Sequence, residues 1–471
     1  MSHTSTDVPN GAQNGGPFRR TFTITILGLV VLVALFAGLN YLQGPKLSSA
    51  SLDTERAVSQ AGQQLRLFAN QPVVAVTAKQ VSVTPAAAFK VTTSGAVIAV
   101  QFRDRLRYST EYTVRILRVA GRLQPQVSNF DYRFNTASAV VYFLDRADPA
   151  SGLEDTIVRT QVRGSQRTVV YSARHIQQFV AFPQAIAVTS LAADGNSSLA
   201  VVATASKLAE QIQLPSEGTV EQLKGDKDAG IIGFVFTSAG SATNRAYDKV
   251  LMRIDLTGSH AAVPVLDLAK RPMTVRSWTF LSSSTSIVAQ ENDGSVFLID
   301  AAKAATPVPL GQYTELGRGS PDGKTVVVGD VYGRLAYSLS DGTKTRLPTL
   351  QFDGATAYGG DLVLVGHGTD RVHQVAVFDP TTGGKYQSYL VYESGSTTRV
   401  LYQNKNQIGT IEGFSVSPNG QYLAVNMIAD YGASVSDGYS VDPQSTSIST
   451  VFVDIAAGTV VSSVTGFDVS W

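Results

Sequence analysis

Three side chains around one short turn are the clearest candidates for chemistry in this 471-residue sequence. His367 and His373 flank Asp370 in the segment HGTDRVH, which lies between two apolar runs that predict strands. A tight hairpin would bring both imidazoles and the carboxylate together, and zinc accepts these ligand types. Because only two nitrogens and one carboxylate are local, we favour a solvated or hydrogen-bonded hairpin and keep a metal site as the alternative.

Two segments, Thr237–Lys249 and Ile428–Ser447, are longer than a hairpin turn requires. The second mixes Ser and Gly with acidic and tyrosine side chains, which is the composition of adaptable binding loops. We favour a disordered loop and keep a binding site as the alternative. The candidate binding residues are Asp430, Tyr431, Asp437 and Tyr439.

The other patterns that can carry chemistry predict ordinary turns. The absence of cysteine excludes disulfides, thiolate catalysis and cysteine-ligated metals. The glycine-rich segment Gly317–Ser320 precedes an expected turn rather than a helix, so it does not predict a phosphate-binding loop. No G-x-S-x-G elbow occurs. We therefore expect no catalytic residues and no cofactor.

Composition and charge define the class of protein that must position these residues. The 38 basic and 37 acidic side chains nearly cancel, which argues against a nucleic-acid partner. The 41 glycines, 18 tyrosines and 20 phenylalanines, with 16% charged residues, favour a β-rich protein. The length predicts two to four domains.

The N-terminal segment predicts a membrane anchor. Residues 1–21 form an expected disordered cytoplasmic tail, and Phe22–Leu42 contains no charge over a length that matches about 30 Å of hydrocarbon. Arg19 and Arg20 precede the apolar run, so residues 47–471 should lie outside the cytoplasm. A cleaved export signal and a buried helix of a soluble protein are the alternatives.

Residues 44–137 contain short alternating runs, such as Ala96–Phe102, that predict a small all-β sandwich. The segments L-x-x-x-T-x-Y-T-V (Leu106–Val114) and Y-R-F-N-T (Tyr132–Thr136), with Asn70–Val73, make this region similar to the bacterial Ig-like domains of surface-layer and envelope proteins. The resemblance implies a spacer or adhesive module in a bacterial envelope protein.

Residues 138–471 repeat a turn followed by an apolar strand. The clearest copies are SPDGKTVVVG (Ser320–Gly329) and SPNGQYLAVN (Ser417–Asn426), with weaker copies at Ala193–Val202 and Ser283–Gln290. This pattern resembles the WD40-like and TolB-like β-propeller repeats and predicts about seven blades, with six or eight as alternatives. The segment Thr459–Val469 is expected to close the ring by pairing with a strand just after Thr136.

Together these features predict a single-pass protein of the bacterial cell membrane that presents an Ig-like sandwich and a β-propeller outside the cell. We expect a noncatalytic binding or scaffold protein whose propeller face binds an envelope protein, a membrane protein or a cell-wall ligand. Two alternatives stay open. One is a propeller enzyme with a dispersed site, either a metal-assisted hydrolase or lactonase or a glycan-cleaving enzyme. The other is an extracytoplasmic regulatory partner of a membrane sensor or secretion system.

Overall fold

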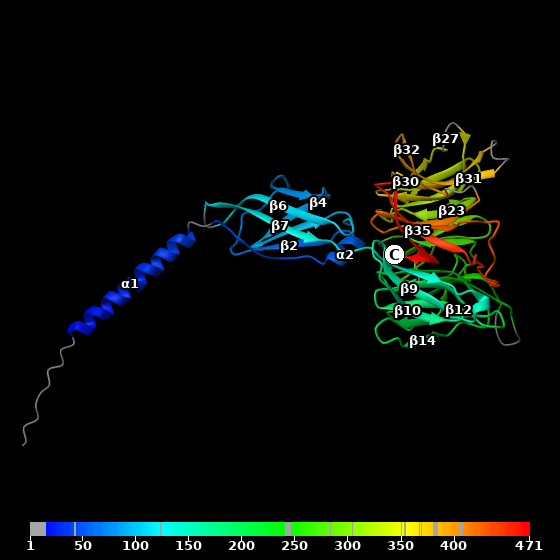
Figure 1. The fold of residues 1–471 in the computed structure, drawn as a ribbon, viewed down its shortest axis with the longest axis horizontal. Coiled ribbons are helices and arrows are strands. Elements are labelled where there is room, and N and C mark those ends of the chain that lie inside the picture. The colour runs from blue at the N-terminus through cyan, green and yellow to red at the C-terminus, as the bar shows by residue number, and fades with distance from the viewer. Residues whose placement is uncertain are drawn as a thin grey trace, which may run out of the picture. The chain divides into compact units, whose positions relative to one another are not determined.

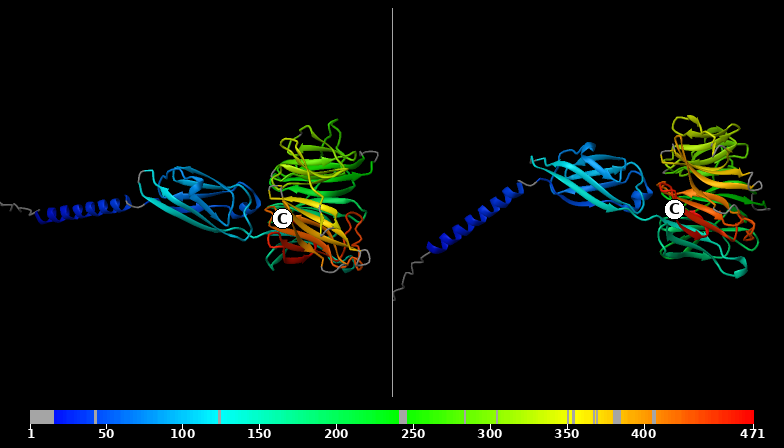
Figure 2. Two further views of the ribbon diagram at one scale, coloured as in Figure 1. Left: turned by 90° about the horizontal axis from the view of Figure 1, so that it is seen from above. Right: turned by 45° about the horizontal axis from the view of Figure 1, so that its top comes forward.

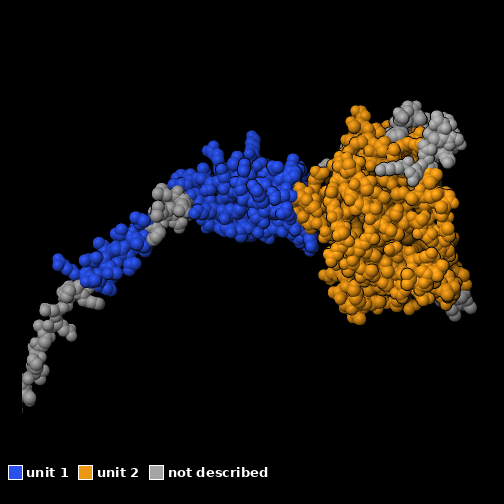
Figure 3. Space-filling model, in the orientation of Figure 1, with its two compact units in different colours: residues 1–57, 61–104, 111–135 blue, residues 58–60, 105–110, 136–471 orange. Residues whose placement is uncertain are grey.

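The computed structural model of the chain is almost entirely β-structure (Figure 1). It describes residues 16–41, 44–122, 125–240, 246–282, 284–303, 305–349, 351–352, 355–366, 368, 370–379, 385–404 and 408–471. At residues 16–19, 36–41, 351–352, 355–356, 378–379 and 385–386 only the backbone is described. The chain divides into two compact units (Figure 3): residues 1–57, 61–104 and 111–135 form unit 1, and residues 58–60, 105–110 and 136–471 form unit 2.

The first helix, α1 (Gly16–Tyr41), has no charged residue after Arg20. Its large apolar side chains from Phe22 to Leu35 are exposed by 45 to 68%, so they pack against no other part of the described chain. No helix in the described part of the chain is long and apolar enough to qualify as a membrane span.

The rest of unit 1 is a two-sheet β-sandwich with a short helix α2 (Thr54–Ser59) and a 3₁₀ turn η1 (Ala78–Gln80). Strands β2 and β5 alternate buried and exposed residues, because one face of each strand covers the core. Tyr112 is buried there and stacks on Phe134 with ring centroids 5.6 Å apart. One sheet has the order β1 (Leu47–Ser51), β2 (Gln64–Ala69), β5 (Val97–Phe102) and β4 (Phe89–Ser94), and the other has β3 (Val81–Thr84), β6 (Glu111–Ala120) and β7 (Val127–Asn135).

Unit 2 contains seven four-stranded antiparallel sheets in its described residues, which we call blades 1 to 7 in chain order. Blade 1 consists of β37 (Phe467–Ser470), β8 (Val140–Asp145), β9 (Asp155–Gln161) and β10 (Arg167–Ala173). Blade 2 consists of β11 (Ile176–Ala181), β12 (Ala185–Leu191), β13 (Ser197–Ala203) and β14 (Ala209–Ile212). Blade 3 consists of β15 (Thr219–Asp226), β16 (Ile231–Ser238), β17 (Tyr247–Asp255) and β18 (Val263–Pro264).

The remaining blades follow the same order of four strands. Blade 4 consists of β19 (Ser277–Phe280), β20 (Ser286–Gln290), β21 (Ser295–Asp300) and β22 (Val308–Gln312). Blade 5 consists of β23 (Glu315–Gly319), β24 (Thr325–Asp330), β25 (Gly333–Ser338) and β26 (Lys344–Arg346). Blade 6 consists of β29 (Tyr358–Val365), β30 (Asp370–Asp379), β31 (Lys385–Ser394) and β32 (Thr397–Gln403), after a small hairpin of β27 (Gln351–Phe352) and β28 (Ala355–Thr356). Blade 7 consists of β33 (Thr410–Val416), β34 (Tyr422–Ile428), β35 (Ile448–Asp454) and β36 (Thr459–Thr465).

The last strand closes the ring. Strand β37 pairs with β8, with Phe467 opposite Leu144, so the C-terminal strands lie beside the first strands of unit 2 (Figure 2). The expected closure therefore occurs, but β36 pairs with β35 and only the final strand joins blade 1. Gly466 makes this step possible because its φ is 120° and a Cβ there would lie 2.5 Å from the Leu144 carbonyl oxygen.

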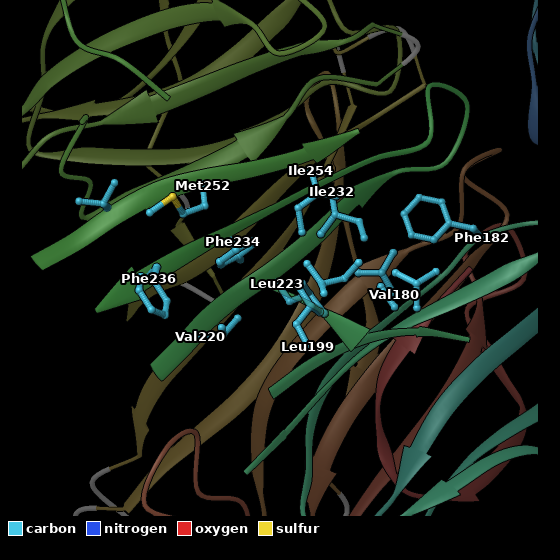
Figure 4. Close-up of a cluster of buried hydrophobic side chains, with 14 residues drawn as sticks. Val180, Phe182, Leu199, Val220, Leu223, Ile232, Phe234, Phe236, Met252 and Ile254 are labelled. Atoms are coloured by element: carbon cyan, nitrogen blue, oxygen red, sulfur yellow. The ribbon is translucent and has the colours of Figure 1, made fainter. Parts of the chain in front are cut away.

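The first strand of every blade is the innermost one, and the first strands contact one another in succession from blade 1 to blade 7. Neighbouring strands of a blade are antiparallel. The loop that leads into the first strand of a blade and the loop that joins its second and third strands therefore lie on the same face of the propeller. We call this the entry face, and the opposite face the exit face. Apolar side chains fill the space between blades, as Val180, Leu199, Val220 and Phe234 do between blades 2 and 3 (Figure 4).

The two strong sequence repeats form equivalent turns on the exit face, between the first and second strands of blades 5 and 7. Ser320 Oγ accepts from Thr325 N at 3.0 Å, and Ser417 Oγ accepts from Tyr422 N at 2.9 Å. The weaker copy at Ala193–Val202 differs, because its turn joins the second and third strands of blade 2 and lies on the entry face. It is therefore not an equivalent of the other repeats.

Candidate binding site

The entry face carries a cavity of about 470 Å³ between blades 7, 1 and 2. Its wall consists of the β8–β9 loop, the β10–β11 turn, the β12–β13 turn and the long loop between β34 and β35. Leu153 and Leu191 supply apolar surface, and Asp437 and Tyr439 supply polar groups from the long loop. Ring closure brings these segments together, since blade 7 ends the chain of blades and blade 1 begins it.

Arg146 holds the long loop in place beneath the cavity. Its Nη1 forms an ion pair with Asp437. Its Nε donates to the Ile176 carbonyl oxygen at 3.0 Å, and its Nη2 donates to that of Gln177 at 2.9 Å. The guanidinium lies 4.0 Å from the ring centroid of Tyr439, which adds a cation–π contact. A single arginine thus joins blades 1, 2 and 7.

Tyr439 is the central side chain of the cavity. Its hydroxyl donates to Asp155 Oδ2, and burial followed by this bond raises the pKa of Tyr439. The Asp155 carboxylate also accepts from Ala147 N at 2.9 Å and from Ile176 N at 2.8 Å. Asp155 is buried, so three donors compensate for its lost hydration.

These contacts decide what the cavity can do chemically. Arg146, Asp437 and Asp155 are each engaged by charged or backbone partners, which makes them structural groups. At the rim, Arg174 and His175 are exposed, and no described residue forms a hydrogen bond with either side chain. The His175 ring meets Tyr439 edge-on, with centroids 5.7 Å apart. The arrangement therefore suits the binding of a ligand with apolar surface and polar groups at its edge.

The structure brings together two of the four candidate binding residues. Asp437 and Tyr439 line the cavity, whereas Asp430 and Tyr431 lie outside its lining. Asp430 Oδ1 accepts from Gly432 N at 3.0 Å and so stabilises a turn, and Tyr431 is exposed on the entry face. Sequence analysis missed Arg146 and His175, which occur in loops without a distinctive composition, and Asp155, which begins strand β9.

The metal site kept as an alternative, with His367, Asp370 and His373, falls partly outside the described residues. His367 lies outside them. Asp370 and His373 are three residues apart on β30, so they lie on opposite faces of the strand. Asp370 accepts from the Tyr392 hydroxyl at 2.6 Å, and His373 Nε2 lies 3.3 Å from Arg334 Nη1. No group of three His, Cys, Asp or Glu side chains in the described parts of the chain could hold a metal ion.

No family model matches the chain, and no curated protein matches it. The chain is similar to TolB from Acinetobacter baumannii (14% identity, 78% of this chain and 80% of that chain, TM-score 0.35). It is also similar to the β-propeller domain of the Trilobed protease from Pyrococcus furiosus (9% identity, 74% and 91%, TM-score 0.43) and to that of Cps50 (Swd1) from Myceliophteria thermophila (10% identity, 62% and 87%, TM-score 0.39). The seven sheets themselves define the class: unit 2 is a β-propeller.

Proposed function

We propose that this protein is a membrane-anchored, extracytoplasmic binding protein that uses the entry face of its propeller to bind an envelope protein or cell-wall ligand. The main observation in support of this proposal is that the cavity and the most exposed large apolar side chains lie on the same face. Leu153, Val331, Tyr332, Tyr431 and Val435 are 64 to 83% exposed in its loops. In the described loops of the exit face, Leu208 is the comparable side chain. Exposed apolar surface of this kind marks interaction sites.

The same geometry favours binding over catalysis. A general acid or base needs a titratable group that is free to contact substrate. Of the three carboxylates that line the cavity, Asp437 is instead held by Arg146, and Asp148 and Asp155 accept from backbone amides. Arg174 and His175 are exposed in the lining and suit recognition of an acidic or hydrogen-bonding group, and Asp148 is exposed there as well.

The proposal includes the membrane anchor and the spacer. The charge-free run Phe22–Leu42 follows Arg19 and Arg20, which supports an anchor with a cytoplasmic N-terminus. The exposed apolar side chains of α1 support the same role. In chain order the sandwich strands pair as first-second-fifth-fourth and third-sixth-seventh, which is the strand order of a constant-type Ig sandwich.

Site-specific photocrosslinking in cells tests the proposed binding face. A crosslinker at Tyr332 or Tyr431 should capture the same partner, whereas one at Leu208 or Val460 should not. Tyr431→Ser should reduce capture at Tyr332 if one partner spans the face. Deleting the long loop is a poorer test, because the deletion also removes Asp437 and leaves Arg146 buried without its carboxylate. Equal capture from both faces, or none from the entry face, would contradict the proposal.

Cysteine labelling tests the proposed topology separately. The natural chain has no cysteine, so a single introduced thiol is the only one present. A membrane-impermeant maleimide applied to intact spheroplasts should label Lys324→Cys and leave Ser5→Cys unlabelled. Labelling of both, or of Ser5→Cys alone, would show a different topology.

A further inference from the structure

The positive charge of the chain is concentrated in its sandwich. Residues 44–137, which include the sandwich, contain 12 basic and 5 acidic side chains, although the whole chain has a net charge of only +1. The remaining residues are therefore acidic on balance. A surface with such an excess of one sign attracts partners of the opposite charge.

One end of the sandwich is formed by the chain entry before β1, the connection between β2 and β3, and the β6–β7 hairpin. Asn70 N donates to the Lys46 carbonyl oxygen at 2.9 Å, and Arg122 N donates to the Pro72 carbonyl oxygen at 3.0 Å. These hydrogen bonds join the three segments into one surface, which we call the basic end. Its described residues are 44–46, 70–80, 117–122 and 125–128.

The basic end carries four cationic side chains and no carboxylate, since none of its segments contains Asp or Glu. Ion pairs of the sandwich such as Arg56–Asp53 and Arg115–Asp131 lie outside this end. The four charges are therefore not balanced within the basic end. All four side chains are exposed, and they belong to Lys46, Lys79, Arg118 and Arg122.

Exposed apolar side chains accompany these charges. Val74, Leu117 and Val127 are 49%, 44% and 50% exposed. Val127 is paired with Ala120 across the hairpin, and Val74 N donates to the Ala120 carbonyl oxygen at 2.9 Å, so the two valines belong to neighbouring segments. Exposed apolar groups among Lys and Arg are typical of surfaces that insert into the headgroup region of an anionic bilayer, because apolar burial and electrostatic attraction add.

The chain holds this end close to the end of α1. Helix α1 ends at Tyr41, and Lys46 lies five residues further on, a length that can span at most about 18 Å. The membrane anchor proposed above therefore keeps the basic end within reach of the lipid headgroups. A surface tethered in this way binds at a high effective concentration, so a few contacts are sufficient.

We propose that the basic end docks on the surface of a bilayer that contains anionic lipids, so that the sandwich rests on the membrane instead of swinging freely on its anchor. This inference rests on the membrane anchor of the proposed function, and it holds for either side of the membrane. Each Lys or Arg near an anionic surface strengthens binding about fivefold. The four cations supply the attraction, and Val74, Leu117 and Val127 supply the apolar contact.

Fluorescence of the full-length protein in nanodiscs tests the inference. The natural chain has no cysteine, so the environment-sensitive dye NBD can be attached to Val127→Cys or to Asn135→Cys, the matched control at the other end of the same strand. In nanodiscs of phosphatidylcholine with phosphatidylglycerol, the Val127 label should emit at shorter wavelength and be less quenched by aqueous acrylamide than in phosphatidylcholine alone. The Asn135 label should behave alike in both.

Matched double variants locate the surface. Arg118→Gln/Arg122→Gln should lower the ratio of docked to undocked protein about tenfold or more, because it removes two of the four cations. Lys90→Gln/Arg103→Gln removes two exposed cations toward the opposite end of the sandwich and should leave the ratio unchanged. High salt should return the Val127 label to water, since screening weakens the same attraction.

The outcomes separate this inference from the anchor on which it rests. Protein that fails to co-purify with nanodiscs would contradict the anchor and the docking together. Protein that co-purifies, but whose Val127 label responds equally in both lipid compositions or loses its response equally in both double variants, would overturn the docking and leave the anchor in place. A shift of the Val127 label produced by polyphosphate on phosphatidylcholine nanodiscs would assign the basic end to an anionic polymer and would also overturn docking on lipid.

Discussion

Arg146 and Asp437 are 291 residues apart in the sequence and form an ion pair whose side chains are only 4% and 2% exposed. The pair joins the start of the propeller to a loop of its last blade. It therefore works with the β37–β8 pairing to close the ring, and it also fixes the wall of the cavity. The binding site and the closure of the fold thus depend on the same contact.

Arg146→Met should destabilise the propeller strongly, because it leaves the Asp437 carboxylate buried without a cation. Loss of one partner of a buried pair costs about 3–5 kcal/mol. Both tryptophans of the chain, Trp278 and Trp471, belong to unit 2, so tryptophan fluorescence during urea unfolding reports on the propeller.

The double variant Arg146→Met/Asp437→Leu should recover part of the loss, since it removes both charges. Arg271→Ala is the control, because its side chain in the Arg271–Asp267 pair is 74% exposed and should contribute less than about 1 kcal/mol. A loss in Arg146→Met no larger than in the control would contradict this account.

Gly233→Ala should also destabilise unit 2, through packing between blades 3 and 4. A Cβ at Gly233 would lie 2.5 Å from Cη2 of Trp278, a fully buried ring that cannot move aside easily. Overpacking of this kind costs about 1–3 kcal/mol. Gly413→Ala is the matched control in another strand, because no atom lies within 4 Å of its added methyl group. Calorimetric melting should show a lowered transition for Gly233→Ala and little change for Gly413→Ala. Equal effects would show that Trp278 does not require the glycine.

The blades were predictable from the sequence because their signals are local. The turns at Ser320 and Ser417 are hydrogen-bonded within a few residues, so the same residue types recur wherever the same turn forms. The residues at which individual blades begin and end were harder to predict from the sequence. Ala193–Gly195 has a similar turn composition but joins different strands of its blade, so composition alone did not show which two strands the turn connects.

The cavity was only half predictable, and the reason is topological. Asp437 and Tyr439 could be named from the sequence as candidate binding residues, because the length and composition of their loop are unusual. Arg146 directly follows β8 and Asp155 begins β9, both near the start of the propeller, and their contacts with those residues arise only when the ring closes. The metal hypothesis stays untested, because His367 lies outside the described residues. Strand β30 begins at Asp370, which places His373 within the strand rather than in the turn.

Asp468 should make the propeller less stable as pH rises from about 4 to 6. Burial raises the pKa of Asp468 to about 6, with the Asp442 carboxylate adding to the rise and Arg146 opposing it. An aspartate in the unfolded chain has a pKa of about 3.9. Between these values the folded state holds the proton and the unfolded state does not, so folding is disfavoured progressively up to pH 6. Asp468→Asn should remove this contribution and raise the urea midpoint at pH 7 relative to pH 4. An unchanged difference between the two pH values would contradict the assignment.

His373 should have the opposite effect on the pH dependence of stability, and its protonation can be measured directly. Burial, followed by Arg334 and Arg371, lowers the pKa of His373 to about 4, against about 6.5 in an unfolded chain. The unfolded state therefore binds a proton between pH 6.5 and 4 that the folded state refuses, so this contribution to stability is complete above pH 6.5 and is lost as pH falls through that window. His260 provides an internal comparison, because hydrogen bonds to the Leu256 carbonyl and to Glu210 raise the pKa of His260. In an NMR titration of protein labelled at histidine, the His373 signal, assigned with His373→Gln, should remain in its neutral position at pH 5.5 while that of His260 is already protonated. A His373 signal that titrates together with His260 would show that the imidazole is reached by water and is not held against the two guanidinium groups.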